Sequence, residues 1–216
     1  MTDTAAFRDG MALLAGAVNV ITTDGPNGRA GFTATAVCSV TDQPPMLLVC
    51  MNRGSWAHPA FEGNGVLCVN VLGAARQDVS GLFADRNVTM DERFARVGAR
   101  RLATGSPVID GALVSFDCRI VDTHTVGSHS VFYCQVEDVA RGEASRSGLV
   151  YFNRGYHDVG DAVGVQVAGD RVVRIAAGGG DAGGSRQVKH GHRETDGGCD
   201  DQGTTNAGHL GLLLGD

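Results

Sequence analysis

The first 158 residues consist mostly of short runs of apolar and β-branched side chains, each bounded by turn residues. The clearest example is the run 17–23, which ends in the sequence DGPNG at 24–28 before a second run follows at 30–40. Glycine and asparagine accept positive φ and proline presets a turn, so this pattern predicts a β-hairpin. Further runs of strand length lie at 46–51, 66–72, 112–125, 131–140 and 149–153. The chain is therefore predicted to be mainly β.

A few segments have helical spacing instead. The first is 4–15, where Phe7, Met11 and Leu14 share one face and Thr4 is the predicted N-cap. Short helices are also predicted at 55–62, 77–83 and 90–97. Six or more strands with few helices and no strand–helix alternation favour an antiparallel barrel with short covering helices. The chain has no GxGxxG sequence after a strand, which disfavours a dinucleotide-binding parallel sheet.

The composition changes near residue 159. From 160 to 216, 15 of the 57 residues are glycine, and the hydrophobic periodicity is lost. Ordering glycine costs more backbone entropy than ordering other residues, so this segment is predicted to be a disordered tail. We expect a folded domain at 1–158 and a Gly-rich tail at 159–216. The short apolar cluster 209–215 leaves open that the end of the tail docks on the domain or on a partner.

Net charge and the lengths of the apolar runs limit which partners and which cellular compartment the sequence favours. The formal net charge is −6, and no basic stripe interleaved with aromatic residues is present, which argues against a nucleic-acid partner. No apolar run approaches the ~20 residues needed to cross a bilayer, and the best imitation of a signal peptide, 11–18, follows acidic rather than basic residues. We therefore expect no membrane association and a cytoplasmic location.

The six cysteines form no CxxC pair. Five lie in apolar segments and are predicted to be buried free thiols: Cys38, Cys50, Cys68, Cys118 and Cys134. Near the C-terminus, His190, His192, Cys199 and His209 have no standard zinc spacing, so no metal site is predicted.

Two segments carry residue types suited to a ligand. The stretch 31–39 has small side chains and three hydroxyl groups in an expected strand, which lets a flat ligand approach the backbone. The stretch 52–55, with sequence NRGS, joins an apolar strand to a helix, where an Arg fork, free N–H groups and a hydroxyl suit a phosphate. Together they suggest a phosphorylated aromatic cofactor. Taken singly, a Thr-rich strand is usually only a strand, and Asn52 with Ser55 is more often a turn and an N-cap.

These residues carry a resemblance to a known family. The sequence AVNVITTDGPNGRAGFTATAVCSVTDQPPMLLVCMNRGS at 17–55, followed by GVLCVNVL at 65–72, resembles the flavin reductase family of FMN-binding split barrels. Within that family it is most similar to the reductases of pyrimidine utilisation and of 4-hydroxyphenylacetate oxidation. The resemblance covers 7–157 and leaves the tail without a counterpart.

The resemblance implies a homodimeric split β-barrel, a Greek-key antiparallel barrel, that reduces FMN or FAD with NADH or NADPH. The reduced flavin then passes to a partner flavin-dependent monooxygenase. The residues implied for the flavin are Thr33, Ala34, Thr35, Ala36, Ser39, Val40, Asn52, Arg53, Gly54, Ser55, Phe83, Phe152 and Arg154. Those implied for the nicotinamide nucleotide are Gly127, His129 and Tyr156. The family has Asp where this chain has Ser128, which puts the role of that carboxylate in doubt.

No catalytic side chain is expected, because hydride passes directly between nicotinamide and flavin when their rings stack. Two alternatives stay open: a flavin carrier without turnover, and a reductase of the same fold with tightly bound flavin that acts on a corrin or ferric chelate. Among the remaining histidines, His58 precedes Pro59 and is expected on a helix surface.

Overall fold

The computed structural model describes residues 3–142, 147–160, 165–168 and 171–174. The helices are α1 (Thr4–Ala12), α2 (His58–Asn64), the 3-10 turn η1 (Ala74–Arg76), α3 (Gln77–Ala84) and α4 (Met90–Arg96). The strands are β1 (Gly16–Ala17), β2 (Asn19–Thr23), β3 (Ala30–Ala34), β4 (Val37–Asp42), β5 (Pro45–Asn52), β6 (Val66–Leu72), β7 (Ala99–Arg101), β8 (Pro107–Ile109), β9 (Ala112–Val126), β10 (His129–Arg141), β11 (Gly148–Phe152), β12 (Gly155–Val159), β13 (Val165–Ala168) and β14 (Arg171–Arg174).

Seven strands form one antiparallel sheet in the order β3-β2-β6-β9-β10-β5-β4. Its two edge strands, β3 and β4, are consecutive in the chain and are joined only by Thr35 and Ala36. The sheet therefore curves until its edges meet at this linker, where no pairing between β3 and β4 is found among the described strands. This is the split of the predicted barrel, and it lies within the small-residue segment.

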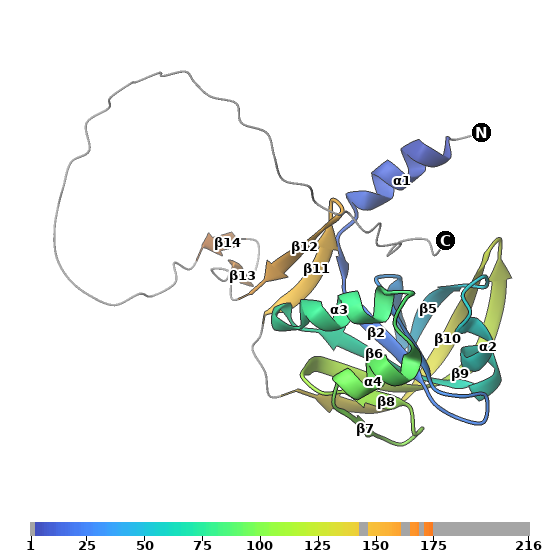
Figure 1. Cartoon of the computed structure of the whole chain (residues 1–216). Coiled ribbons are helices and arrows are strands. Elements are labelled where there is room, and N and C mark those ends of the chain that lie inside the picture. Colours follow the sequence, from blue (N-terminus) through green and yellow to red (C-terminus); the bar gives the residue numbers. More distant parts are fainter. Residues whose placement is uncertain (1–2, 143–146, 161–164, 169–170, 175–216) are drawn as a thin grey trace, which may run out of the picture. The chain divides into compact units, whose positions relative to one another are not determined.

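The core has two parts because the central strands are buried on both faces. Inside the curved sheet, Ile21, Leu67, Val69 and Phe132 belong to one cluster. On the outer face, Val20 and Leu72 pack in a second cluster with Phe83 of α3 and other residues of the covering helices (Figure 1). Burial on both faces explains why β2 is buried at all five positions and β6 at six of its seven, with no alternation between buried and exposed residues.

A buried amide fixes β8 against the outer face of β6. Asn70 is fully buried, and its side-chain oxygen accepts hydrogen bonds from the Ile109 amide at 2.9 Å and the Ser115 hydroxyl at 2.8 Å. Its amide nitrogen donates to the Val20 carbonyl at 3.0 Å. Buried polar atoms need such partners, so a single polar residue inside an apolar strand specifies where β8 lies.

The predicted elements are largely confirmed, with corrections at their ends. β6 matches its predicted range, and α3 and α4 differ from theirs by one residue. The predicted run 30–40 is interrupted by the linker at the split. The predicted N-cap Thr4 is wrong: Asp3 caps α1, because its carboxylate accepts from the amides of Ala5 and Ala6. β7, β8 and β12 were not predicted.

β13 and β14 pair as an antiparallel hairpin within a unit separate from the barrel. They lie in the segment 159–216 that is predicted to be a Gly-rich tail. The prediction for the rest of that segment, including 209–215 and the four candidate metal ligands, concerns residues outside those that the structure describes.

Candidate functional site

The predicted phosphate-binding segment is a tight turn between β5 and α2. The Asn52 side-chain oxygen accepts from the Gly54 amide at 2.8 Å, and the Ser55 amide donates to the Asn52 carbonyl at 3.1 Å. Asn52 thus shapes the turn, as expected for a turn residue. Arg53 is exposed, and within the described part of the chain its guanidinium has no ion pair or hydrogen bond. That cation is available to an anion from solvent.

The predicted nicotinamide residues lie beside this turn. Gly127 has φ +56° in the turn that joins β9 to β10, and His129 pairs with Asn52 across β10 and β5. The Arg53 amide donates to the Ser128 carbonyl at 2.9 Å. Two segments that are 75 residues apart in sequence, and that were assigned to different ligands, therefore adjoin at one end of the barrel.

Ser128 occupies the position at which the chain departs from the family pattern. Its hydroxyl lies 2.9 Å from Nδ1 of His129. A hydrogen bond to one ring nitrogen fixes the tautomer and the orientation of the other. The serine hydroxyl, which can donate or accept, therefore orients the imidazole ring without adding a negative charge.

The predicted flavin residues around the split differ in their exposure to solvent. Thr35 and Ala36 form the linker and are half-buried, whereas Ser39 and Val40 on β4 are exposed. The side chain of Ala34 lies in the inner core cluster. The Cys50 amide donates to the Ala36 carbonyl at 3.0 Å, two residues before Asn52. The linker is thus tied to the strand that leads into the phosphate turn.

A second contact network joins β3, α3 and β12. The Thr33 hydroxyl donates to the Ser80 carbonyl at 2.7 Å, and the Ser80 hydroxyl lies 2.8 Å from that of Tyr156. Phe83, one turn further along α3, is 2% exposed and packs edge-on against Phe94 at 5.2 Å. Its ring is so close to Gly31 that a Cβ there would lie 2.7 Å away. Phe83 therefore supports β3 from the outer face of the sheet.

Phe152 and Arg154 lie on the hairpin between β11 and β12. Phe152 packs edge-on against His157 at 5.8 Å, and Arg154 forms an ion pair with Asp9 of α1. Arg154 and Asn153 both have positive φ, which identifies a tight two-residue turn. The ion pair between Arg154 and Asp9 joins the hairpin to α1, whereas the Phe152–His157 contact lies within the hairpin. Neither contact involves the phosphate turn.

Sequence reasoning missed a groove of about 450 Å³ beside the phosphate turn. It is lined by Trp56, which follows Ser55 and is 62% exposed, and by the loop that joins α3 to α4. Arg93 holds this loop: its buried guanidinium donates to the carbonyls of Phe83 at 2.9 Å and Val88 at 3.0 Å. The signal in the sequence is that the chain's single Trp directly follows the NRGS motif.

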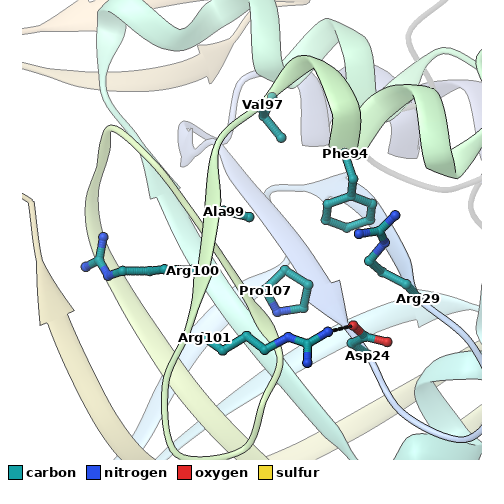
Figure 2. Close-up of a pocket in the computed structure, with 8 residues that line it drawn as sticks. All are labelled: Asp24, Arg29, Phe94, Val97, Ala99, Arg100, Arg101 and Pro107. Atoms are coloured by element: carbon teal, nitrogen blue, oxygen red, sulfur yellow. Dashed lines mark hydrogen bonds and ion pairs between the residues drawn. The ribbon is translucent and has the colours of Figure 1, made fainter.

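A different cavity, of about 360 Å³, lies away from every predicted site residue, between β7, β8, α4 and the β2–β3 turn (Figure 2). Its lining includes three arginines, and each is paired: Arg29 with Asp91 at 3.2 Å, Arg100 with Asp110 at 3.7 Å, and Arg101 with Asp24 at 2.6 Å. Arg29 also stacks over Phe94 at 4.6 Å. Because these cations already have carboxylate partners, we do not assign a ligand to this cavity.

The titratable groups near the predicted site include a cysteine and a tyrosine. Burial raises the pKa of Cys50, and its neighbour Cys38 raises it further. Burial also raises the pKa of Tyr156, although the hydrogen bond with Ser80 opposes that shift. All five predicted thiols are free. The prediction of burial is confirmed for Cys68, Cys118 and Cys134, but it is wrong for Cys38, which is exposed on β4, and Cys50 is only half-buried.

The described residues include neither a metal-ligand cluster nor a membrane-spanning helix. No group of three or more His, Cys, Asp or Glu side chains in that part of the chain is placed to hold a metal ion. None of its helices is long and apolar enough to cross a membrane.

Comparison with known families gives the decisive observation. The model of the flavin reductase like domain matches residues 11–160. The chain belongs to the flavin reductase family. The match spans the barrel, α3, α4 and the β11–β12 hairpin, and so includes every residue predicted to contact flavin or nicotinamide.

The chain is similar in sequence and in structure to individual flavin reductases. It is 57% identical over 155 residues to the FMN reductase (NADH) RutF of Variovorax paradoxus, which covers 72% of this chain and 85% of that protein. It resembles the solved structure of BorF, the flavin reductase component of a bacterial two-component tryptophan halogenase, with 31% identity, a TM-score of 0.68 and coverage of 74% and 100%. The Streptomyces globisporus NADH:FAD oxidoreductase SgcE6, solved with NAD and FAD fragments, is 26% identical, with a TM-score of 0.67 and coverage of 74% and 94%.

Proposed function

We propose that this chain is an NAD(P)H-dependent flavin reductase that uses NADH to reduce FMN, accepts FAD as an alternative, and supplies the reduced flavin to a partner monooxygenase. The observation that carries the proposal is the 2.9 Å hydrogen bond between the Arg53 amide and the Ser128 carbonyl, which joins the phosphate turn to the nicotinamide segment. The proposal is supported by the 57% identity to an FMN reductase (NADH) and by the likeness to reductase components of two-component systems.

The residues present fit a flavin phosphate. Arg53 offers an unpaired guanidinium, and Gly54 and Ser55 add a bare backbone and a hydroxyl in the same turn. Thr35 and Ala36 at the split are half-buried and have small side chains, which would let a flat ring pack against the backbone there. Bound flavin supplies the hydride-accepting chemistry, while these residues would hold and orient it.

His129 and the Gly127 turn would hold the nicotinamide nucleotide. Ser128 fixes the imidazole through Nδ1, so Nε2 is left to contact a carboxamide or a phosphate. The Tyr156 hydroxyl is hydrogen-bonded to the Ser80 hydroxyl, and the Ser80 carbonyl accepts from Thr33 of β3. Tyr156 therefore lies near β3, one of the two edge strands that meet at the split. The chain's contribution to the reaction is therefore to orient the two rings, which is worth several orders of magnitude in rate.

A homodimer is part of the proposal. β4 is an edge strand whose residues 38–42 are all exposed, and Val40 is 45% exposed. Val121 and Val126 are also exposed toward the end of the β9–β10 hairpin. Exposed apolar side chains around the proposed ligand residues suit a surface that a second copy covers. Light scattering coupled to gel filtration should give twice the chain mass of 22.4 kDa, and a monomer would refute this part.

We also place the protein in the cytoplasm, and catalysis in the segment 1–158. Five free thiols among the described cysteines suit a reducing compartment. The family match ends at residue 160, so the tail is proposed to be dispensable for flavin reduction.

The test is NADH and NADPH oxidation followed at 340 nm, with and without added FMN, FAD or riboflavin. We expect oxidation that depends on added flavin, with NADH and FMN preferred. Oxidation without added flavin, together with a yellow protein after purification, would instead favour a tightly bound flavin that serves another acceptor such as a corrin or ferric chelate. Flavin binding without oxidation would favour a carrier.

A further inference from the structure

His58 is not on the helix surface where the sequence suggested. It is 6% exposed in the first turn of α2, and its Nε2 lies 2.9 Å from the Ser130 hydroxyl, which is 1% exposed. The imidazole also stacks on Phe132, with 5.8 Å between ring centroids and 25° between planes. A buried histidine with one specific polar partner is costly to disturb, because loss of either partner leaves a buried polar atom without a hydrogen bond.

The two partners belong to the two halves of the proposed site. The His58 amide donates to the Ser55 carbonyl at 3.0 Å, so His58 is tied to the end of the phosphate turn. Ser130 is the next residue after His129. The Arg53 amide already bridges to Ser128 at the start of the same turn. The turn is therefore attached at both ends to the start of β10, at Ser128 just before the strand and at Ser130 within it. We call this pair of bonds, Arg53–Ser128 and His58–Ser130, the double clip.

The double clip adds to the β5–β10 pairing, which sets His129 opposite Asn52, in determining where His129 lies. Successive side chains in a strand point to opposite faces, so the inward direction of Ser130 leaves His129 directed outward. His129 is flanked by the two clipped residues, and its position relative to Arg53 is fixed by both bonds. A displacement of the phosphate turn must then either move His129 with it or break one bond of the clip.

We propose that His58 and Ser130 are positioning residues that couple flavin binding at the phosphate turn to nicotinamide binding at His129. This inference rests on the proposed function. Neither side chain touches the ligands; each acts by holding the two segments in one arrangement. Binding of the first ligand then fixes the segment that the second ligand uses, which is a coupling between sites and is reciprocal.

The experiment measures that coupling directly. FMN is titrated by its fluorescence in the absence and in the presence of saturating NAD⁺, which does not react with oxidised FMN. In the unmodified full-length protein we expect NAD⁺ to tighten FMN binding at least fivefold, the lower end of common coupling factors. In Ser130→Ala we expect less than a twofold effect of NAD⁺, and His58→Gln, which keeps a hydrogen-bonding group, should retain an intermediate effect.

A matched control separates coupling from loss of stability. Ser115 is 2% exposed and donates a 2.8 Å hydrogen bond to Asn70, far along the sheet from the phosphate turn. Ser115→Ala removes a buried serine hydrogen bond of similar length, 2.8 Å against 2.9 Å, and should keep the full effect of NAD⁺. If Ser130→Ala does not fold because it leaves the buried Nε2 of His58 unpaired, the double variant His58→Phe/Ser130→Ala removes both polar atoms and should show the same less-than-twofold effect of NAD⁺.

The outcomes distinguish the inference from the proposed function. If the unmodified protein oxidises NADH with FMN but NAD⁺ does not change its affinity for FMN, the inference is overturned and the function stands. The same conclusion follows if Ser130→Ala and Ser115→Ala retain equal coupling. If the unmodified protein neither binds FMN nor oxidises NADH, the proposed function itself fails.

Discussion

Replacing Arg53 with Ala should weaken FMN binding while leaving riboflavin binding nearly unchanged. The two flavins differ by the phosphate, and Arg53 is the unpaired cation of the turn proposed to hold it. A hydrogen bond to a charged group contributes about 1.5–3 kcal/mol. Because Arg53 is exposed and water screens its charge, we take the lower end, about 1.5 kcal/mol, which corresponds to about a tenfold rise in Kd.

The assay is fluorescence titration of each flavin against the unmodified protein, Arg53→Ala, Arg53→Lys and Arg101→Ala. Arg101 also loses one positive charge on substitution, but it lies in the cavity of Figure 2 and pairs with Asp24 at 2.6 Å. It therefore controls for a general change in electrostatic potential. Arg53→Lys keeps the charge but loses the planar fork, so its Kd should lie between those of the unmodified protein and Arg53→Ala.

Equal losses for FMN and riboflavin would remove Arg53 from the phosphate role. So would a loss in Arg101→Ala as large as that in Arg53→Ala, because the effect would then be one of overall charge. Raising the salt concentration should reduce the difference between the unmodified protein and Arg53→Ala, since the screened contact is worth less.

Three further substitutions test other parts of the structure. His129→Ala should raise the KM for NADH several-fold with the Kd for FMN nearly unchanged, and steady-state kinetics with flavin titration would show the reverse if His129 served the flavin. Gly31→Ala should lower the free energy of unfolding by about 1–3 kcal/mol in urea, because its Cβ would meet the Phe83 ring at 2.7 Å; unchanged stability would mean that the ring moves aside at no cost. Tyr156→Phe tests the pH dependence: burial raises the pKa of Tyr156 above its ordinary value of 10.0, so the unfolded state loses this proton first and the free energy of unfolding falls as pH rises above 10.0. Urea unfolding at pH 9 and pH 11 should show a smaller fall in Tyr156→Phe, and an equal fall would assign the alkaline loss to other groups.

Local sequence patterns predicted most of the strands because each pattern has a local physical cause. The DGPNG turn requires positive φ, which Gly28 adopts at +90°, and the continuous apolar run of β6 reflects burial on both faces. The same patterns could not predict that the run 30–40 divides at Thr35 and Ala36, because that division depends on the two edges of a seven-stranded sheet meeting in space.

Residue types alone singled out the segments 31–39 and 52–55, the resemblance added the other candidate residues, and their arrangement came from the fold. No local signal in NRGS indicates that its Arg53 amide bonds to Ser128, because the contact depends on the pairing register of β5 and β10. The burial of His58 could not be predicted either, because it too depends on a residue that is distant in the sequence. A histidine before Pro59 in a short helix is usually exposed, and only the partner Ser130, 72 residues away, makes its burial acceptable.

Burial divides the residues around the proposed site by role. The side chains that set its shape are buried, as His58, Ser130 and Phe83 are, whereas Arg53 and Gly54, which the proposal assigns to the flavin phosphate, are exposed. A ligand held by exposed side chains and backbone groups loses less of its water contact on binding, and differences in affinity appear mostly as differences in dissociation rate. A reductase that supplies its product to another enzyme must release reduced flavin at every turnover. A rigid buried frame that carries an open binding surface meets both needs, because the frame orients the rings while the open surface lets the product leave.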